Sequence, residues 1–216
     1  MAVRVEDLER GKARETGAEG TGGKAEVQAL VERAASSSFG AFGEIYDIFL
    51  DRIFRYVFYQ VKDRMTAEDL TEEIFLKAWE AMGKYKQKNS SFSAWLYRIA
   101  HNHVIDYFRT RRQHVALEDV TPSAPDNPEQ EVEEKAMQQE LAEVISSLPP
   151  QQKQVIILKF IEGMDNVEIA RIMDKREGAI RMLQMRALMA LRQKLTGPDS
   201  AYDLNYLKPL VKVYDG

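Results

Sequence analysis

Two helical patterns meet in residues 148–195, which read LPPQQKQVIILKFIEGMDNVEIARIMDKREGAIRMLQMRALMALRQKL. Ala170 belongs to the first pattern, Asp174 lies at a short polar turn, and Ile180 follows six residues later in the second pattern. This spacing is typical of a helix-turn-helix, in which a small residue lets two helices cross closely. Asp also tolerates the left-handed backbone that such a turn needs. We therefore predict a helix-turn-helix whose second helix faces outward.

The second helix of this pair has two distinct faces. The apolar face that packs is formed by Ile180, Leu183, Ala187, Leu191 and Leu195, which recur at three- and four-residue steps. The other face carries Arg181, Met182, Met185 and Arg186. Residues 175–194 hold six basic residues and one acid, although the whole chain has a net charge of −4. A positive helix on an acidic protein indicates a polyanionic partner, and a solvated face of a helical bundle is the alternative.

Composition limits the class of protein. The chain has 216 residues, of which 44% are hydrophobic and 30% charged, so that it can form one or two globular domains. It contains no cysteine, which excludes disulfides and thiolate chemistry and fits a reducing compartment. No apolar run is long enough for a membrane span, and residues 1–24 lack the apolar core of a signal peptide. We expect a cytoplasmic protein that does not insert into membranes.

An acidic segment divides the chain into two helical parts. Seven acids, three prolines and no basic residue lie between Glu118 and Glu134, a composition typical of an extended linker. The fold class that follows is all-α, with two small helical domains joined by an acidic flexible linker. The predicted parts are a disordered arm (1–24), a helical domain (25–113), the linker (114–137), a second helical domain (138–196) and a C-terminal extension (197–216).

The first domain is predicted to contain a long core helix at residues 39–63, because apolar residues keep helical period there. Thr66 and Asp69 are a plausible capping pair for a second helix that ends near Met82. Its exposed side carries the acids Glu68, Asp69, Glu72, Glu73 and Glu80. Such a face repels nucleic acid and favours a basic protein surface, and simple solvation is the alternative.

A third helix, residues 92–112, follows a loop with three lysines at residues 83–91. The helix mixes aromatic residues with arginines and contains one acid, Asp106. Aromatic rings can stack on unpaired bases while arginines hold phosphates, which is the chemistry of single-stranded nucleic-acid binding. A helical row of aromatic residues also commonly packs in a core, so both interpretations stay open here.

The sequence offers no site for catalysis, a metal or a cofactor. His101 and His103 are two residues apart and point away from each other on a helix. Residues 18–25, AEGTGGKA, only partly match a phosphate-binding loop, and no assembled nucleophile motif is present. We therefore do not expect an enzyme.

The chain resembles the extracytoplasmic-function (ECF) RNA polymerase sigma factors. The resemblance covers about residues 39–195 and depends on AEDLTEEIFLKAW (67–79), FSAWLYRIAHNHVIDYFRTRR (92–112) and LPPQQKQVIILKFIEGM (148–164) in this order. It implies a transcription initiation factor that binds core RNA polymerase and directs it to promoters by recognising minus-35 duplex and melted minus-10 DNA. A stand-alone helix-turn-helix regulator that binds duplex DNA only is the alternative.

The resemblance implies three sets of binding residues. Contacts with the clamp of the polymerase largest subunit are expected from Asp69, Glu72, Glu73 and Phe75. Contacts with minus-10 DNA are expected from Tyr85, Lys86, Lys88, Trp95, Arg98, Asn102 and Arg109. Contacts with minus-35 DNA are expected from Lys159, Arg176, Arg181, Met182, Met185 and Arg186.

Two further expectations come from the resemblance. The polymerase beta-flap is expected on the apolar side of the second domain, and an anti-sigma factor is a possible further partner. Many relatives carry Ser-Arg-Leu where this chain has Met182, Leu183 and Gln184. Polar base contacts at this position are therefore expected to give way to apolar contact with thymine methyl groups.

Overall fold

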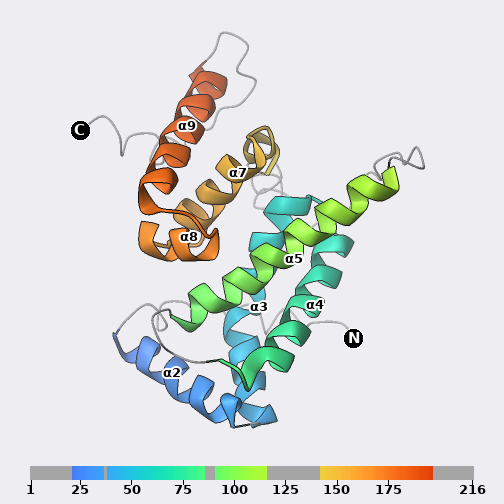
Figure 1. Ribbon diagram of the computed structural model, residues 1–216, viewed down its shortest axis with the longest axis vertical. Helices are drawn as coiled ribbons and strands as arrows, with labels where there is room; N and C mark the ends of the chain where they lie inside the picture. Colours follow the sequence, from blue (N-terminus) through green and yellow to red (C-terminus); the bar gives the residue numbers. More distant parts are fainter. Residues whose placement is uncertain (1–20, 37, 86–90, 116–141, 197–216) are drawn as a thin grey trace, which may run out of the picture.

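The computed structural model describes residues 21–36, 38–85, 91–115 and 142–196, and every regular element in these ranges is a helix (Figure 1). This confirms the all-α prediction. The predicted arm up to residue 20, most of the acidic linker and the C-terminal extension lie outside the described residues. Within the described ranges, none of the helices is both long enough and apolar enough to cross a membrane.

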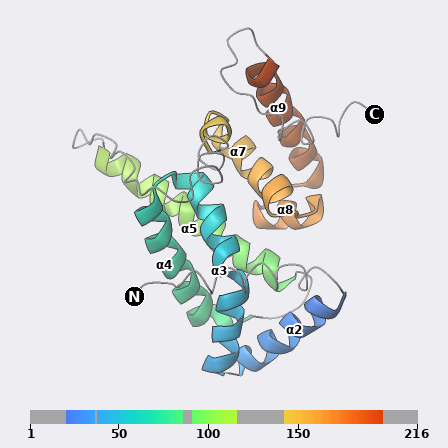
Figure 2. The same cartoon turned by 180° about the vertical axis from the view of Figure 1, so that it is seen from behind.

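The amino-terminal domain consists of four helices, α2 (Thr21–Ala35), α3 (Phe39–Val61), α4 (Arg64–Met82) and α5 (Phe92–Val115). Helix α3 lies at its centre and contacts the other three (Figures 1 and 2). Its apolar side includes Ile45, Ile53 and Val57, all fully buried, which explains why the helical period of this segment was so regular in the sequence. Ser38 caps its start by accepting a hydrogen bond from the Ala41 N–H.

Two helix starts differ from the prediction. Helix α2 begins at Thr21, inside the arm that was predicted to be disordered up to residue 24. Helix α4 begins at Arg64 and is capped by Asp63, whose Oδ2 accepts the Thr66 N–H at 2.7 Å. The predicted cap at Thr66 is therefore wrong by one turn, because Asp63 supplies the stronger, charged acceptor three residues earlier. This hydrogen bond also lowers the pKa of Asp63.

The carboxy-terminal domain contains a helical segment at 142–146, α7 (Pro150–Ile156), a π-helical turn η1 (Ile157–Ile161), α8 (Asn166–Ile172) and α9 (Glu177–Thr196). The predicted helix-turn-helix is formed by α8 and α9. Asp174 has φ 52°, as the turn requires, and the Lys175 N–H donates to the Ala170 carbonyl at 2.8 Å. Asp165 and Glu168 form a capping box at the start of α8.

The two domains pack directly against each other. Helix α5 contacts α8 (Figures 1 and 2). The π-helical turn η1 contacts α3. Buried apolar side chains of both domains belong to one continuous cluster. The sequence contained no sign of this packing, because the linker composition indicated only that the two domains are separate units.

Candidate polymerase and nucleic-acid interfaces

An acidic face on α4 is formed by Asp69, Glu72 and Glu73, all of which are exposed. Glu73 also contacts α5, where its Oε2 lies 2.7 Å from Nε2 of His103. Leu76 lies one turn further along α4 and is 58% exposed. Leu76 was not among the predicted contact residues, and the signal for it is that it falls outside the series of apolar residues that packs on α3. The acidic face with Leu76 at its edge can bind a basic surface that also offers an apolar contact.

Phe75 does not lie on the acidic face. Its side chain is only 3% exposed, and its ring centroid lies 4.7 Å from that of Tyr46 on α3. Phe75 therefore lies inside the amino-terminal domain, and its direct contact with the polymerase stays a prediction. Its packing on Tyr46 anchors α4 on α3 and thereby holds the acidic residues in place.

An aromatic cluster of Tyr85, Phe92 and Trp95 lies where the chain enters α5. The ring centroids of Tyr85 and Trp95 are 5.0 Å apart, and Phe92 lies within 5.7 Å of both. Phe92 is buried, while Tyr85 and Trp95 are half-buried. Burial raises the pKa of the Tyr85 hydroxyl, which stays protonated and has no hydrogen-bond partner among the described residues. The Tyr85 hydroxyl is itself buried, so the cluster offers the partly exposed ring faces of Tyr85 and Trp95 to a base.

Polar residues continue from the aromatic cluster along α5. Arg98 and Asn102 are exposed and lie one helical turn apart. Arg109 is exposed further along the helix and forms an ion pair with Asp106 at 3.0 Å. The predicted contacts Lys86 and Lys88 lie outside the described residues. The structure thus brings Trp95, Arg98 and Asn102 together and leaves Arg109 apart from them.

The reading face of α9 consists of Arg181, Met182, Met185 and Arg186, all exposed as predicted. Arg181 forms an ion pair with Glu177 at 3.2 Å, one turn earlier in the helix. Gln184 takes no part, because it is 2% exposed and donates to Oδ1 of Asn166 at 3.0 Å. Of the three residues that depart from the family pattern, only Met182 therefore reaches the reading face.

The other predicted minus-35 residues lie beside the helix-turn-helix. Arg176 is exposed in the turn, and its carbonyl accepts the N–H groups of Ala179 and Ile180 at the start of α9. Lys159 is half-buried in η1. Both positions suit contacts with a phosphate backbone better than contacts with bases.

A buried carboxylate at the domain interface was missed by sequence analysis. Glu162 follows η1, and its side chain is fully buried. Its Oε1 lies 3.1 Å from Nε of Arg55, its Oε2 lies 3.6 Å from Nε of Arg52, and it accepts the hydroxyl of Tyr97. Burial and the charge of Glu162 raise the pKa of Tyr97, which keeps this donor protonated. The available signal was that Glu162 is the single acid between residues 144 and 164.

A second polar group crosses the same interface. Gln154 donates to the hydroxyl of Tyr56 at 2.8 Å and contacts Nδ1 of His101. The ammonium of Lys153 donates to the Gln60 carbonyl at 2.8 Å, and its burial lowers its pKa to about 8. These contacts fix the orientation of one domain on the other, since each needs a matched donor and acceptor.

His101 makes stability depend on pH. Its burial, followed by the positive charges of Lys175 and Arg98, lowers its pKa to about 4 from 6.5. Between these values the unfolded chain binds more protons than the folded protein, so the free energy of unfolding falls as the pH falls. We expect a loss of about 2 kcal/mol between pH 7 and pH 5, measured by urea unfolding. In His101→Gln this part of the loss should vanish, and an unchanged loss would contradict the assignment.

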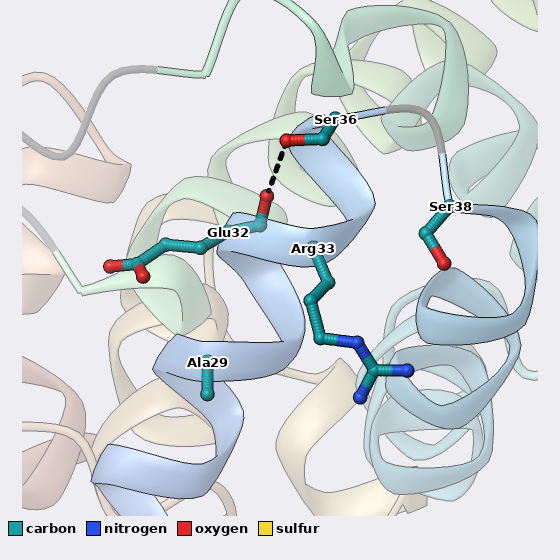
Figure 3. A pocket seen from close by; sticks show the side chains of 5 residues that line it. All are labelled: Ala29, Glu32, Arg33, Ser36 and Ser38. Atoms are coloured by element: carbon teal, nitrogen blue, oxygen red, sulfur yellow. Dashed lines mark hydrogen bonds between the residues drawn. The ribbon is translucent and has the colours of Figure 1, made fainter.

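A surface pocket between α2 and α3 lies apart from these sites. Its lining consists of Ala29, Glu32, Arg33, Ser36 and Ser38 (Figure 3). The Ser36 hydroxyl donates a hydrogen bond to the Glu32 carbonyl, and the Arg33 guanidinium forms an ion pair with Glu44 at 3.6 Å. Across the ranges described, no group of three or more His, Asp or Glu side chains is arranged to hold a metal ion.

Comparisons with known proteins agree with this arrangement. The Sigma-70 region 2 family model matches residues 45–114, and the Sigma-70 region 4 model matches residues 138–191. The ECF RNA polymerase sigma factor BldN of Streptomyces coelicolor is 39% identical over 183 residues, which cover 82% of this chain and 68% of BldN. SigM of Bacillus subtilis, also an ECF sigma factor, is 27% identical over 154 residues, which cover 69% of this chain and 91% of SigM.

Among solved structures, CnrH in complex with the cytosolic domain of CnrY has the same fold. The TM-score is 0.62 at 23% sequence identity, and the match covers 77% of this chain and 95% of CnrH. The two matched family models fall on the two helical domains described above.

Proposed function

This chain belongs to the ECF RNA polymerase sigma factors, and we propose that three of its surfaces have separate roles in promoter recognition. The acidic face of α4 binds the clamp of core RNA polymerase. The aromatic cluster, with Arg98 and Asn102, binds the melted minus-10 strand. The reading face of α9 enters the major groove at the minus-35 element.

The observation that supports this proposal is that the two domains carry two chemically different surfaces, each suited to a different form of DNA. On α9, exposed arginines flank two methionines, which suits base edges and methyl groups in a duplex groove. On α5, half-buried aromatic rings lie beside exposed polar side chains, which suits unstacked bases. A regulator that binds duplex DNA only has no use for the α5 surface, so the family and the geometry favour a sigma factor over that alternative.

At the minus-35 element, Met182 and Met185 are proposed to contact thymine methyl groups, while Arg181 and Arg186 bind bases or phosphates. Arg176 and Lys159 hold the backbone on either side. At the minus-10 element, Tyr85 and Trp95 stack against an unpaired base. Asn102 and Arg98 then supply polar contacts that recover part of the unstacking energy, which is a few kcal/mol per step.

The partners proposed for this chain are core RNA polymerase, promoter DNA and an anti-sigma factor. Support for the last comes from solved neighbours of the same fold, one of which is described as a sigma factor in complex with the anti-sigma factor NepR from Bartonella quintana. We further propose that the protein acts in the cytoplasm, where the polymerase and the promoter are.

Run-off transcription with purified core polymerase tests the proposed function. Adding the full chain should produce a transcript from a promoter, with thymines around minus-10 becoming reactive to permanganate. Asn102→Ala should reduce this reactivity while the melting temperature stays unchanged, because the residue is exposed. Binding to duplex DNA without any transcript would instead support the stand-alone regulator.

Gly178 provides a test of close approach between α9 and DNA. It is exposed in the first turn of α9, and a Cβ at this position would meet no atom within 4 Å. Gly178→Ala should therefore stabilise the fold, by at most about 1 kcal/mol in urea unfolding, because alanine is the better helix former. The same methyl group should weaken binding to minus-35 duplex DNA by crowding the groove.

Gly40→Ala is the matched control, because Gly40 is also the second residue of its helix and is also open to solvent. It should give a similar gain in stability without any change in DNA affinity. Equal DNA affinity of Gly178→Ala and the unmodified protein would mean that α9 does not lie close to the bases.

A further inference from the structure

Three methionines lie along the exposed side of α9. Met182, Met185 and Met189 are 45%, 40% and 65% exposed, and they recur at steps of three and four residues, so that they follow one face of the helix. We call these three residues the methionine stripe. Its first two members belong to the reading face, and Met189 lies one turn further along α9. The part of α9 that is proposed to contact bases therefore presents two thioether groups to solvent.

The other described methionines are of two kinds. Met82, Met164 and Met173 are buried, with at most 6% of their surface exposed, and belong to the hydrophobic core. Met65, at the start of α4 in the amino-terminal domain, is 73% exposed and makes none of the proposed DNA contacts. The chain contains no cysteine, so that no thiol competes with the thioether groups for an oxidant. A mild oxidant should therefore modify the exposed methionines and leave the core intact.

A peroxide can convert an exposed methionine into methionine sulfoxide. A lone pair of the sulfur attacks one peroxide oxygen, an S–O bond forms, and the O–O bond breaks. The sulfur loses two electrons and the peroxide gains them, while the proton of the transferred oxygen passes to the departing hydroxide, which leaves as water. The product replaces a flexible apolar side chain with a polar one, and methionine sulfoxide reductases can reverse the change.

The polarity of a sulfoxide matters in a DNA groove. Met182 and Met185 are proposed to contact thymine methyl groups, which have neither a hydrogen-bond donor nor an acceptor. A sulfoxide oxygen packed against such a methyl group would lose its hydrogen bonds with water and gain none in return. Contacts of Arg181 and Arg186 with phosphates would remain, because oxidation leaves the arginine charge unchanged. Oxidation should therefore weaken base-specific binding more than non-specific binding.

From this arrangement we propose that Met182 and Met185 are a reversible oxidation site that lowers the affinity of the protein for its minus-35 element. This regulation rests on the proposed function, because it acts through the contact of α9 with minus-35 DNA. The modification itself can be measured without DNA. Since the buried methionines are protected, the modified protein keeps its fold and regains its affinity after reduction.

The first experiment locates the modification. The full chain is treated with hydrogen peroxide, the peroxide is removed with catalase, and peptide mass spectrometry measures the fraction of each methionine that carries one added oxygen. The methionine stripe and Met65 should be oxidised at least about tenfold faster than the three buried methionines, because burial restricts access. Circular dichroism should give the same melting temperature before and after treatment. Similar oxidation rates for exposed and buried methionines would overturn the proposal, because affinity could then fall through unfolding.

The second experiment measures the effect on DNA binding. Treated or untreated chain is assembled with saturating core polymerase, and fluorescence anisotropy at fixed salt measures its affinity for a labelled minus-35 duplex, which the untreated complex has selected from a random-sequence pool. Oxidation should lower this affinity at least about fivefold, because a sulfoxide oxygen is buried without a donor. Affinity for a duplex of unrelated sequence should change less than about twofold, because phosphate contacts remain. Methionine sulfoxide reductases A and B, one for each sulfoxide epimer, should restore the affinity.

Two double variants assign the effect to the reading face. In Met182→Leu with Met185→Leu, leucine remains apolar and cannot be oxidised, so that peroxide should no longer change the affinity, whatever its starting value. Met65→Leu with Met189→Leu is the matched control, because it removes two exposed methionines outside the reading face. This control should lose affinity on oxidation to the same extent as the unmodified protein.

The outcomes separate the oxidation site from the proposed function. Equal sensitivity of the Met182→Leu, Met185→Leu protein and the unmodified protein would overturn the oxidation site and leave the proposed function standing. Loss of sensitivity in the control variant, or an oxidised unmodified protein that binds the minus-35 duplex as tightly as before, would have the same meaning. If the untreated complex enriches no sequence from the pool, the proposed function is overturned, and with it the role of oxidation at the minus-35 element.

Discussion

A protein carrying Asp69→Lys and Glu72→Lys is expected to lose capture of core RNA polymerase. Both side chains are exposed on α4, so the change replaces two negative charges of the acidic face with two positive ones. Like charges across an interface cost several kcal/mol, which corresponds to a fall in affinity of more than about a hundredfold. Surface plasmon resonance with immobilised core polymerase measures the effect. Glu73 is left unchanged, because it also pairs with His103 and its replacement would disturb the contact between α4 and α5.

Glu26→Lys with Glu143→Lys controls for net charge. Both residues are exposed and lie outside the acidic face, so this pair changes the total charge by the same amount. We expect it to retain polymerase binding. Equal loss in the two double variants would show that net charge, and not the acidic face, determines binding.

Arg181→Ala is expected to weaken binding to minus-35 duplex DNA without affecting polymerase capture. A bidentate arginine–guanine contact contributes about 1 to 3 kcal/mol, so the affinity should fall between about 5-fold and 150-fold. Fluorescence anisotropy with a labelled minus-35 duplex at fixed salt measures this loss. Folding should change little, since the variant removes only the exposed ion pair with Glu177.

Arg33→Ala is the matched control for Arg181→Ala. Arg33 is likewise an exposed arginine paired with a glutamate, Glu44, and it lies on α2 in the other domain. It should leave duplex affinity unchanged. A weakened polymerase interaction in Arg181→Ala would contradict the assignment of α9 to DNA.

Local rules explain why the helices could be predicted from the sequence. The apolar period of α3, the capping box at Asp165 and the left-handed residue at Asp174 depend on neighbours a few positions away. The exposure of Arg181 and Met182 was likewise predictable, because the opposite side of α9 is apolar. Side-chain period therefore predicted the packed side of α3 and the exposed face of α9 correctly.

Features that depend on another element could not be predicted from the sequence. Phe75 follows the acids of α4 in sequence, and only the position of Tyr46 on α3 shows that it is buried. The role of Glu162 was invisible for the same reason, since Arg52 and Tyr97 are far from it in the chain. Sequence period indicates which side of a helix is apolar, and it says nothing about which distant partner covers it.

Helix α5 takes part both in the proposed contact with melted DNA and in the packing of the two domains. It carries Trp95 and Asn102 for the melted strand, and it also carries Tyr97, which holds the carboxylate of the other domain. Exchanging one domain between family members would therefore affect the DNA-contacting residues and the domain interface differently. A hybrid that joins the first domain of this chain to the second domain of a relative without an acid at the position of Glu162 would keep the residues of both proposed DNA surfaces. It would leave Arg52, Arg55 and Tyr97 without the carboxylate that they bind here. In such a chain, the choice of promoter and the fit between the two domains would have to be engineered separately.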